Sequence, residues 1–306
     1  MRLALLFPGQ GSQRVGMGKE FYRSSFRVHR LFEEADEILG RPISRMILDG
    51  PEDLLIRTEN SQPAIFLVSF ACFAVWQEGG GNLPVVGAGH SLGEYTALAA
   101  AGVFSFSDGL QLVNNRATLM AQAERENPGG MAAVLGVPEE KIAQVCQEVG
   151  EVWPANYNAP GQIVISGKTR ALHKAKQLLC EQFGGKVVPL KVSGAFHSPL
   201  MESARAGLEK IIHHFSFRTP NFPVFSNVTA QRLSHPEEIK QRLVEQITSP
   251  VRWADLITHI WTEEKPDSFL EVGPGKILSG LIKRIIPEAS VGEIDISDKQ
   301  QNETGG

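Results

Sequence analysis

The fold of this chain is decided by residues 85–95, which read VVGAGHSLGEY. A short apolar run leads into a G-x-S-x-G pentapeptide centred on Ser91, and an alanine-rich segment with helical character follows it. A serine on a tight turn between a strand and a helix projects its hydroxyl from the sheet edge, and the flanking glycines leave room for that turn. The helix N-terminus directs amide groups at any oxyanion formed there. Such pentapeptides also occur by chance in glycine-rich loops, but the flanking strand and helix predict a nucleophile elbow with Ser91 as acyl acceptor.

Length and composition set the outer limits of the interpretation. The 306 residues, 42% of them hydrophobic, suffice for one large domain or for a large and a small one. A formal net charge of -4 shows no basic excess and argues against a nucleic-acid partner. Cys72, Cys146 and Cys180 are odd in number and widely scattered, which argues against a disulfide framework or a zinc site and fits a reducing cytoplasm.

Two apolar segments resemble a membrane-spanning helix or a secretory signal in their composition. Residues 64–76 form the longest apolar stretch, which at 13 residues falls short of the roughly 20 that a spanning helix needs, so a buried helix is expected there. Residues 1–9 carry a short apolar run that ends at Pro-Gly, which predicts a buried first strand instead of a signal peptide. We therefore expect no association with a membrane.

Strands alternate with helices along most of the chain, which is the pattern of an α/β protein with a largely parallel sheet. A polar loop at residues 9–13 follows the first strand, and one helix is expected over roughly residues 19–39. A second helix is expected over residues 61–77, with Pro63 in its first turn, where a missing amide donor is tolerated. A further helix opens near residue 107 and carries Arg116 on its second or third turn.

The stretch between residues 127 and 192 has an order of its own. It reads strand, helix, strand, strand, helix, strand, which is the ferredoxin-like order. We therefore expect a small ferredoxin-like domain of residues 127–192, inserted in a large α/β catalytic domain formed by residues 1–126 and 193–290. Residues 291–306 are polar and end in Gly-Gly, which predicts a disordered tail.

A nucleophilic serine needs a general base, and among the eight histidines His197 has the most suitable surroundings. It lies at the end of a strand and directly before a helix that Ser198 can cap, a kind of loop position where rigid scaffolds hold catalytic groups. His90 is adjacent to the serine, but neighbouring side chains on an elbow diverge, so packing support is its favoured role over that of a base. The other histidines fall on amphipathic helices or in polar turns, where they are expected to be solvated.

Several further motifs accompany the elbow in a fixed order. They are residues 7–13 (FPGQGSQ), 89–94 (GHSLGE), 115–116 (NR), 158–162 (NAPGQ), 196–198 (FHS), 249–253 (SPVRW) and 271–275 (EVGPG). Together they resemble the malonyl-CoA:acyl carrier protein transacylases, including the free-standing acyltransferases that serve polyketide synthases. The resemblance covers roughly residues 1–287 and is far more specific than the pentapeptide alone. It implies an α/β-hydrolase-like large domain with a parallel sheet and the small ferredoxin-like domain as an insertion.

The resemblance also implies a chemistry, ping-pong acyl transfer with Ser91 and His197 as the catalytic residues. Ser91 would attack the thioester carbonyl, while His197 would accept the serine proton and return one to the leaving thiolate. The family orients this histidine with a backbone carbonyl in place of an Asp, and by motif position the carbonyl is that of Gln246. The oxyanion would be held by the amides of Gln10 and Leu92.

The resemblance further assigns the acyl pocket. Arg116 would pair its planar guanidinium with the free carboxylate of a malonyl group inside a dry pocket, although an arginine on a helix is more often solvated. By family position, Gln62, Asn158 and His90 are further substrate-binding candidates, and the first two could equally be capping or turn residues. Phe196 would place a bulky ring beside the acyl α-carbon and crowd out a methyl branch.

The function predicted from these residues is transfer of a malonyl group from malonyl-CoA, through Ser91, to the phosphopantetheine thiol of an acyl carrier protein. A cytoplasmic monomer with no metal and no bound cofactor is expected. One alternative is an acyl hydrolase of the same fold, in which water replaces the carrier thiol. Another is a non-catalytic docking protein for carrier domains. The sequence does not distinguish fatty-acid from polyketide synthesis, and it favours a structural role for Glu271, the acid near a late strand end.

Overall fold

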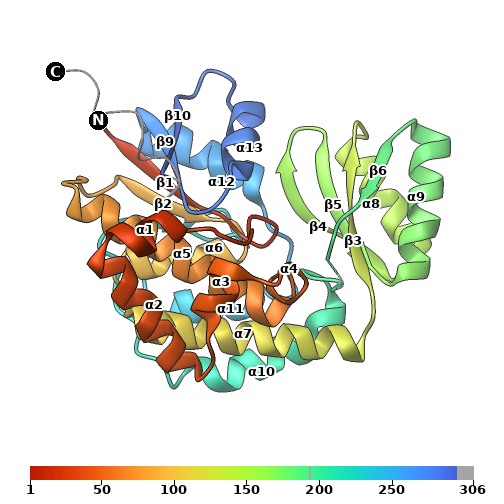
Figure 1. Ribbon diagram of the computed structural model, residues 1–306. Coiled ribbons are helices and arrows are strands. Elements are labelled where there is room, and N and C mark those ends of the chain that lie inside the picture. Colours follow the sequence, from red (N-terminus) through yellow and green to blue (C-terminus); the bar gives the residue numbers. More distant parts are fainter. Residues whose placement is uncertain (193, 295–306) are drawn as a thin grey trace.

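Two β-sheets lie side by side in the computed structural model, which describes residues 1–192 and 194–294 (Figure 1). The larger assembly fills the left of the view and contains the N-terminal helices and the C-terminal strands. The smaller assembly stands at its right. We propose to divide the chain there as the sequence suggests, into residues 1–126 with 193–290 and residues 127–192, with residue 193 itself outside the described residues.

The large sheet has the strand order β10-β9-β1-β2-β7-β8. Its strands are β1 (Leu3–Phe7), β2 (Val86–Gly89), β7 (Val224–Phe225), β8 (Arg232–Leu233), β9 (Ser268–Val272) and β10 (Val291–Ile294). All neighbouring strands are parallel except β7 and β8. The two central strands, β1 and β2, are almost entirely buried, as expected for a parallel sheet that helices cover on both faces.

Alternate residues of β1 enter two different hydrophobic clusters. Leu5 and Phe7 belong to one cluster, whereas Ala4 and Leu6 belong to the other. Because successive strand side chains point to opposite faces, helices must cover the sheet on both sides. The first cluster is formed with α1 (Lys19–Ser24), α2 (Phe26–Leu39), α3 (Ile43–Asp49), α4 (Glu52–Leu55), α5 (Thr58–Glu78), α6 (Leu92–Ala100), α7 (Phe106–Glu126), α10 (Glu202–Ile212) and α11 (Pro236–Glu245). The second is formed with α12 (Trp253–His259), the following π-helical turn (Ile260–Glu264) and α13 (Ile277–Ile285).

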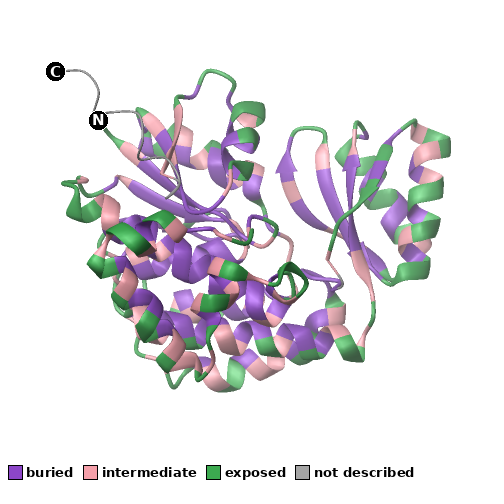
Figure 2. Cartoon of the chain, viewed as in Figure 1, coloured by how far each residue is buried: buried purple, intermediate pink, exposed green. Residues whose placement is uncertain are grey.

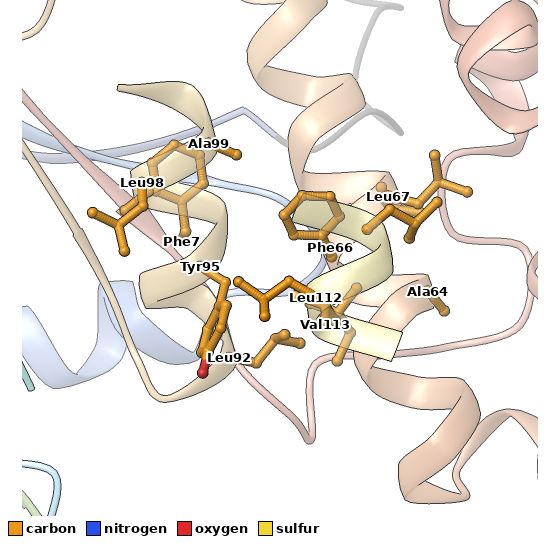
Figure 3. Packing of buried hydrophobic residues seen from close by; sticks show 14 of the residues in the cluster. Phe7, Ala64, Phe66, Leu67, Leu92, Tyr95, Leu98, Ala99, Leu112 and Val113 are labelled. Atoms are coloured by element: carbon orange, nitrogen blue, oxygen red, sulfur yellow. The ribbon is translucent and has the colours of Figure 1, made fainter. Parts of the chain in front are cut away.

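Helices α5, α6 and α7 all contribute to the first cluster, and Figure 3 shows Phe66, Tyr95 and Val113 from these three helices within it. Helices α5 and α6 are buried along most of their length (Figure 2). The small alanine side chains of α6 let this helix lie close to its neighbours. On α7, Arg116 follows Val113 by three residues and so shares its inward face. Within the described ranges, no helix combines the length and apolar character needed to cross a bilayer.

The small sheet has the strand order β4-β5-β3-β6 and is antiparallel throughout. Its elements follow the chain as β3 (Gly130–Leu135), α8 (Glu139–Val149), β4 (Val152–Ala159), β5 (Gln162–Gly167), α9 (Thr169–Phe183) and β6 (Lys186–Pro189). This is the ferredoxin-like order that the sequence predicts. Ala132 and Val134 of β3 pack with α8 and α9, whereas Met131 and Ala133 join the large-domain cluster. One face of the small sheet therefore closes over the large domain.

A short backbone ladder fixes the two assemblies to each other. Asn156 of β4 and Val251 form a parallel bridge. The amide of Tyr157 donates to the Val251 carbonyl at 2.9 Å, and the Val251 amide donates to the Ala155 carbonyl at 2.8 Å. The segment before α12 thus continues the edge of the small sheet.

The structure corrects two expectations about the first helices. The helix expected over residues 19–39 is two helices, α1 and α2, because Ser25 is extended (φ -113°) and its hydroxyl accepts from the Val28 amide as the N-cap of α2. Helix α5 begins earlier than expected, so Pro63 lies inside it instead of in its first turn. Proline leaves the carbonyl four residues earlier without its helical donor. Here the side chain of Arg41 donates to that carbonyl, which belongs to Glu59, at 2.7 Å.

The expected disordered tail begins too early. Residues 291–294 form β10, which runs parallel to β9 with Val291 opposite Phe269 and Ile294 opposite Val272. The outer edge of β9 needs partners for its backbone groups, and the short segment Val291–Ile294, which begins and ends with a β-branched apolar residue, supplies them. The rest of the predicted tail, residues 295–306, lies outside the described residues.

The elbow depends on two glycines that bring β1, β2 and α6 into backbone contact. A Cβ at Gly89 would lie 1.8 Å from the Gly93 carbonyl carbon, and a Cβ at Gly93 would lie 2.0 Å from the Phe7 carbonyl oxygen. Neither obstacle is a flexible side chain. Both positions therefore require glycine for the strands and helix to approach as they do.

We expect Gly93→Ala to destabilise the protein by about 3 kcal/mol or more, because backbone atoms must separate to admit the methyl group. This should lower the melting temperature by roughly 5 °C or more, or abolish soluble expression. Gly280→Ala is the matched control, since its Cβ would meet nothing within 4 Å and the position lies in helix α13. Differential scanning calorimetry of both variants tests the claim, and equal melting temperatures would contradict it.

Candidate active site

Ser91 lies at the junction of β2 and α6 with a strained backbone. Its φ of 53° and ψ of -107° place a non-glycine residue at positive φ, which persists only when the surroundings enforce it. Asn227 supplies that constraint, because its Oδ1 accepts from the Ser91 amide at 2.6 Å and its Nδ2 donates to the Gly89 carbonyl at 2.8 Å. The turn is the sharp strand-to-helix geometry that the pentapeptide predicts.

His197 contacts Ser91 although it lies 106 residues later in the sequence. Its Nε2 lies 2.8 Å from the Ser91 Oγ, and its Nδ1 lies 2.9 Å from the main-chain oxygen of Gln246. Gln246 is the residue after α11, where helix carbonyls have no amide partner within the helix and carry partial negative charge. With Nδ1–H donating to this carbonyl, Nε2 is left as the acceptor that faces the serine.

Burial keeps the imidazole neutral. Burial, followed by the positive charge of Arg116, lowers the pKa of His197 to about 3. A neutral imidazole is the form able to take a proton.

Arg116 is almost fully buried beside the serine. Its Nη2 donates to the Ser91 Oγ at 3.1 Å and to the side-chain oxygen of Gln246 at 2.9 Å, and its Nη1 donates to the Gln62 Oε1 at 2.5 Å. The guanidinium also lies over the Tyr95 ring, 5.2 Å from its centroid. Burial lowers the pKa of Arg116, although the group stays cationic at neutral pH.

A small cavity of about 80 Å³ opens in front of these groups. Its lining includes Gln10 and Leu92, together with the bulky side chains of Met120, Met131 and Phe196. Leu92 is the first residue of α6, so its amide is a helix donor with no partner inside the helix.

A second, larger cavity of about 930 Å³ shares several lining residues with the first, among them Gln10 and His90. It also includes Asn158 of β4 and the apolar side chains of Ile277 and Leu281. A third cavity of about 970 Å³, beyond β4, includes none of the predicted site residues. The chemistry therefore sits at the bottom of the second cavity.

His90 belongs to the support of the elbow. Its Nε2 lies 2.8 Å from the Asn158 Oδ1, and its ring packs on Trp253 with centroids 5.4 Å apart. Burial lowers the pKa of His90, so it stays a neutral partner of the amide. The contact joins the elbow to strand β4 of the small sheet.

The structure brings most of the predicted site residues together, and their chemical roles stay predictions. Two of the predicted substrate-binding residues do not line the inner cavity: Gln62 lies behind Arg116, and Asn158 lines the outer cavity. Sequence reasoning missed Asn227, Glu94 and the side chain of Gln246. Glu94 left a signal, since it is the one charged residue in the alanine-rich segment after the elbow. Asn227 left none, because it stands in an ordinary polar turn.

Glu271 is engaged elsewhere in the fold. Its carboxylate accepts from the amides of Leu278 and Ser279 at 3.1 and 2.7 Å and from the Ser279 hydroxyl at 2.7 Å, so it caps helix α13. In the described part of the chain, no group of three or more His, Cys, Asp or Glu side chains could hold a metal ion.

Comparison with known proteins places this geometry in a family. Residues 4–296 match the acyl transferase domain family. The chain belongs to this family. It is 43% identical over 288 residues to the malonyl CoA-acyl carrier protein transacylase of Bacillus subtilis, covering 93% of this chain and 90% of the relative. It is also 43% identical over 290 residues to the polyketide biosynthesis malonyl CoA-acyl carrier protein transacylase PksC of the same organism, covering 94% and 98% of the two chains.

Solved structures of malonyl transacylases share the fold of this acyl transferase. A malonyl-transacylase in complex with its type II polyketide synthase acyl carrier protein superposes with a TM-score of 0.93 at 39% identity, covering 96% of both chains. The transacylase of Xanthomonas oryzae superposes equally well, with a TM-score of 0.93 at 40% identity and 96% coverage of each chain. The family resemblance and the fold class predicted from the sequence motifs are thereby confirmed.

We expect the rate at which a thioester acylates Ser91 to show no fall around the ordinary imidazole pKa. His197 has a pKa of about 3 and is therefore neutral at pH values well above it. The unfolded chain binds this proton near pH 6.5 and the folded chain only near 3, so stability falls as pH drops through that window. Rapid-quench mass spectrometry between pH 5 and 8, at temperatures where calorimetry shows folded protein, measures the rate. A tenfold loss centred on pH 6.5 in folded protein would contradict the assignment of the base.

Proposed function

We propose that this acyl transferase moves a malonyl group from malonyl-CoA to the phosphopantetheine thiol of an acyl carrier protein, through an ester on Ser91. The observation that carries the proposal is the buried guanidinium of Arg116, 3.1 Å from the Ser91 hydroxyl. A fixed cation at this distance suits an acyl group that ends in a carboxylate.

In the first half-reaction, the Ser91 oxygen attacks the thioester carbonyl while His197 Nε2 accepts the hydroxyl proton. The amides of Gln10 and Leu92 donate to the oxyanion, and such donors are each worth about 3 kcal/mol in the transition state. When the intermediate collapses, the C–S bond breaks and the CoA sulfur takes the proton from the imidazolium. The products are free CoA and malonyl-Ser91.

The second half-reaction runs through the same groups in reverse. His197 takes the proton of the carrier thiol, the sulfur attacks the malonyl ester, and the Ser91 oxygen leaves with that proton. The carbonyl of Gln246 accepts from Nδ1–H in both halves, so it holds the ring in place and stabilises its charged form. No group beyond these residues is needed to balance protons.

The cavity dimensions fit this substrate. The inner cavity of about 80 Å³ suits a short acyl chain, and Phe196 and Met120 in its wall oppose an α-methyl branch. The outer cavity of about 930 Å³, with apolar walls at Ile277 and Leu281, suits a pantetheine arm from either CoA or a carrier. The relatives include both general and polyketide-associated transacylases, so the pathway is left open. The monomeric state, the cytoplasmic location and the absence of a bound cofactor stay predictions.

Hydrolysis of acyl carriers is the competing function of a serine and histidine pair. A hydrolase that clears stalled acyl groups gains from accepting uncharged chains, and a buried cation in the pocket opposes them. Arg116 therefore favours transfer of malonyl groups.

We expect incubation with malonyl-CoA alone to leave one malonyl group on Ser91, and addition of a holo acyl carrier protein to discharge it. Ser91→Ala should carry no adduct. Intact-protein mass spectrometry follows both steps. Equal labelling of the alanine variant would remove Ser91 as nucleophile, and discharge by water as fast as by carrier would establish the hydrolase instead.

We expect Arg116→Ala to shift selectivity in addition to weakening the enzyme. Loss of the guanidinium leaves a malonyl carboxylate unpaired in a dry pocket, a penalty of roughly 3–5 kcal/mol, whereas acetyl transfer gains from the vacated space. Arg116→Lys should rescue malonyl transfer poorly, because an ammonium does not reproduce the two-pronged contact. Values of kcat/KM for malonyl-CoA and acetyl-CoA test this, and an equal fall for both thioesters in Arg116→Ala would make the arginine structural.

A further inference from the structure

Glu94 is a buried carboxylate that the mechanism above does not use. It lies in the first turn of α6, three residues after the nucleophile, and its exposed fraction is 0%. It does not line the inner or the outer cavity. An acid in such surroundings persists only if its hydrogen bonds repay its burial.

The hydrogen bonds of Glu94 connect it to residues that contact Ser91. Its Oε2 accepts from the side-chain Nε2 of Gln246 at 2.6 Å and from the main-chain amide of Asn227 at 3.1 Å. The same Nε2 of Gln246 donates to the Ser91 carbonyl at 3.1 Å. The Oε1 of Glu94 has no hydrogen-bond partner among the described residues.

We propose that Glu94 is a positioning residue that fixes the side-chain amide of Gln246. The oxygen of that amide then holds Arg116 toward the acyl pocket. In this way Glu94 sets the preference for acyl groups that bear a carboxylate. This inference rests on the proposed malonyl transfer.

The direction of the amide follows from which groups can donate. A guanidinium only donates hydrogen bonds, so the atom of Gln246 that faces Arg116 must be the oxygen, and this leaves Nε2 for the accepting Oε2 of Glu94. With its Nε2 toward Glu94, Gln246 presents its Oε1 to Arg116 Nη2 at 2.9 Å. Turning the amide over would set donor against donor at Arg116 and acceptor against acceptor at Glu94. The chain from Arg116 through Gln246 to Glu94 therefore has one favourable direction.

The amide between the two charges also matters for binding. A carboxylate in direct contact with Arg116 would occupy the guanidinium and compete with the carboxylate of the substrate. One residue removed, Glu94 in its ionised form still offsets the buried positive charge, and on the side that faces Ser91 the guanidinium contacts only a neutral hydroxyl, which does not compete with a carboxylate as a charged partner would. The arrangement stabilises the cation without consuming its binding capacity.

The test compares kcat/KM for malonyl-CoA and acetyl-CoA, because a merely structural residue would lower both by one factor. We expect Glu94→Met, which removes the acceptor, to lower the ratio of malonyl to acetyl kcat/KM at least tenfold. Glu94→Gln keeps an acceptor oxygen in place and should restore most of that ratio relative to Glu94→Met.

Glu271→Met is the matched control, since Glu271 is also 0% exposed but caps α13. It should lower the melting temperature and leave the ratio unchanged. If Glu94→Met does not fold, Gln246→Met carries the test, because it removes the side-chain link and keeps the carbonyl that His197 contacts. It should lower the ratio at least tenfold as well.

An unchanged ratio in folded Glu94→Met, or in Gln246→Met, overturns the inference. An equal fall for both thioesters does the same, because it describes a structural role. Failure of the proposed function looks different, since the wild-type protein would then form no malonyl-Ser91 at all.

Discussion

The contact between the backbones of β1, β2 and α6 is the constraint on which the site depends. Gly89 and Gly93 let the helix start directly above the Phe7 carbonyl, so the turn between them has no room to relax. Ser91 is therefore held at a φ of 53°, which lifts its hydroxyl out of the sheet and leaves the amide of Leu92 free of helical partners. The proposed nucleophile and its proposed oxyanion donor arise from one piece of local geometry.

Burial of Arg116 is the second demand that shapes the surroundings. A guanidinium removed from water needs acceptors for its N–H groups, and neutral acceptors from three elements serve Nη1 and Nη2, whereas Nε has no hydrogen-bond partner among the described residues. Gln62 comes from α5, Ser91 from the elbow and Gln246 from the end of α11. Gln246 also contacts His197 through its main chain. One residue thus sets the positions of the base and of the cation, which explains why the two lie on either side of the same hydroxyl.

The sequence predicted what local motifs encode. Ser91 and His197 stood out because their neighbours predict an elbow and a strand end, whereas Arg116 was singled out by the family resemblance. Glu94 and Asn227 were missed because their roles depend on a contact between them. That contact joins residues 133 positions apart in the chain, and no spacing rule connects them. Strand β10 was missed for a related reason, since four residues at the start of a polar C-terminal segment become a strand only beside β9. The break at Ser25 was also missed, although serine is a common N-cap residue.

The neutral carbonyl behind His197 gives Arg116 an effect beyond binding. A carboxylate at Nδ1 would raise the basicity of the imidazole whatever acyl group is present. Here burial lowers the pKa of His197 to about 3, and the charge of Arg116 is the next largest cause. A malonyl carboxylate paired with Arg116 removes part of that second cause, so the imidazolium formed in the transition state becomes easier to form when the acyl group is charged. An acetyl group leaves the cation uncompensated and the base weak. In the proposed reaction selectivity then has a catalytic component, because a carboxylate bound by Arg116 would also improve the proposed base, His197.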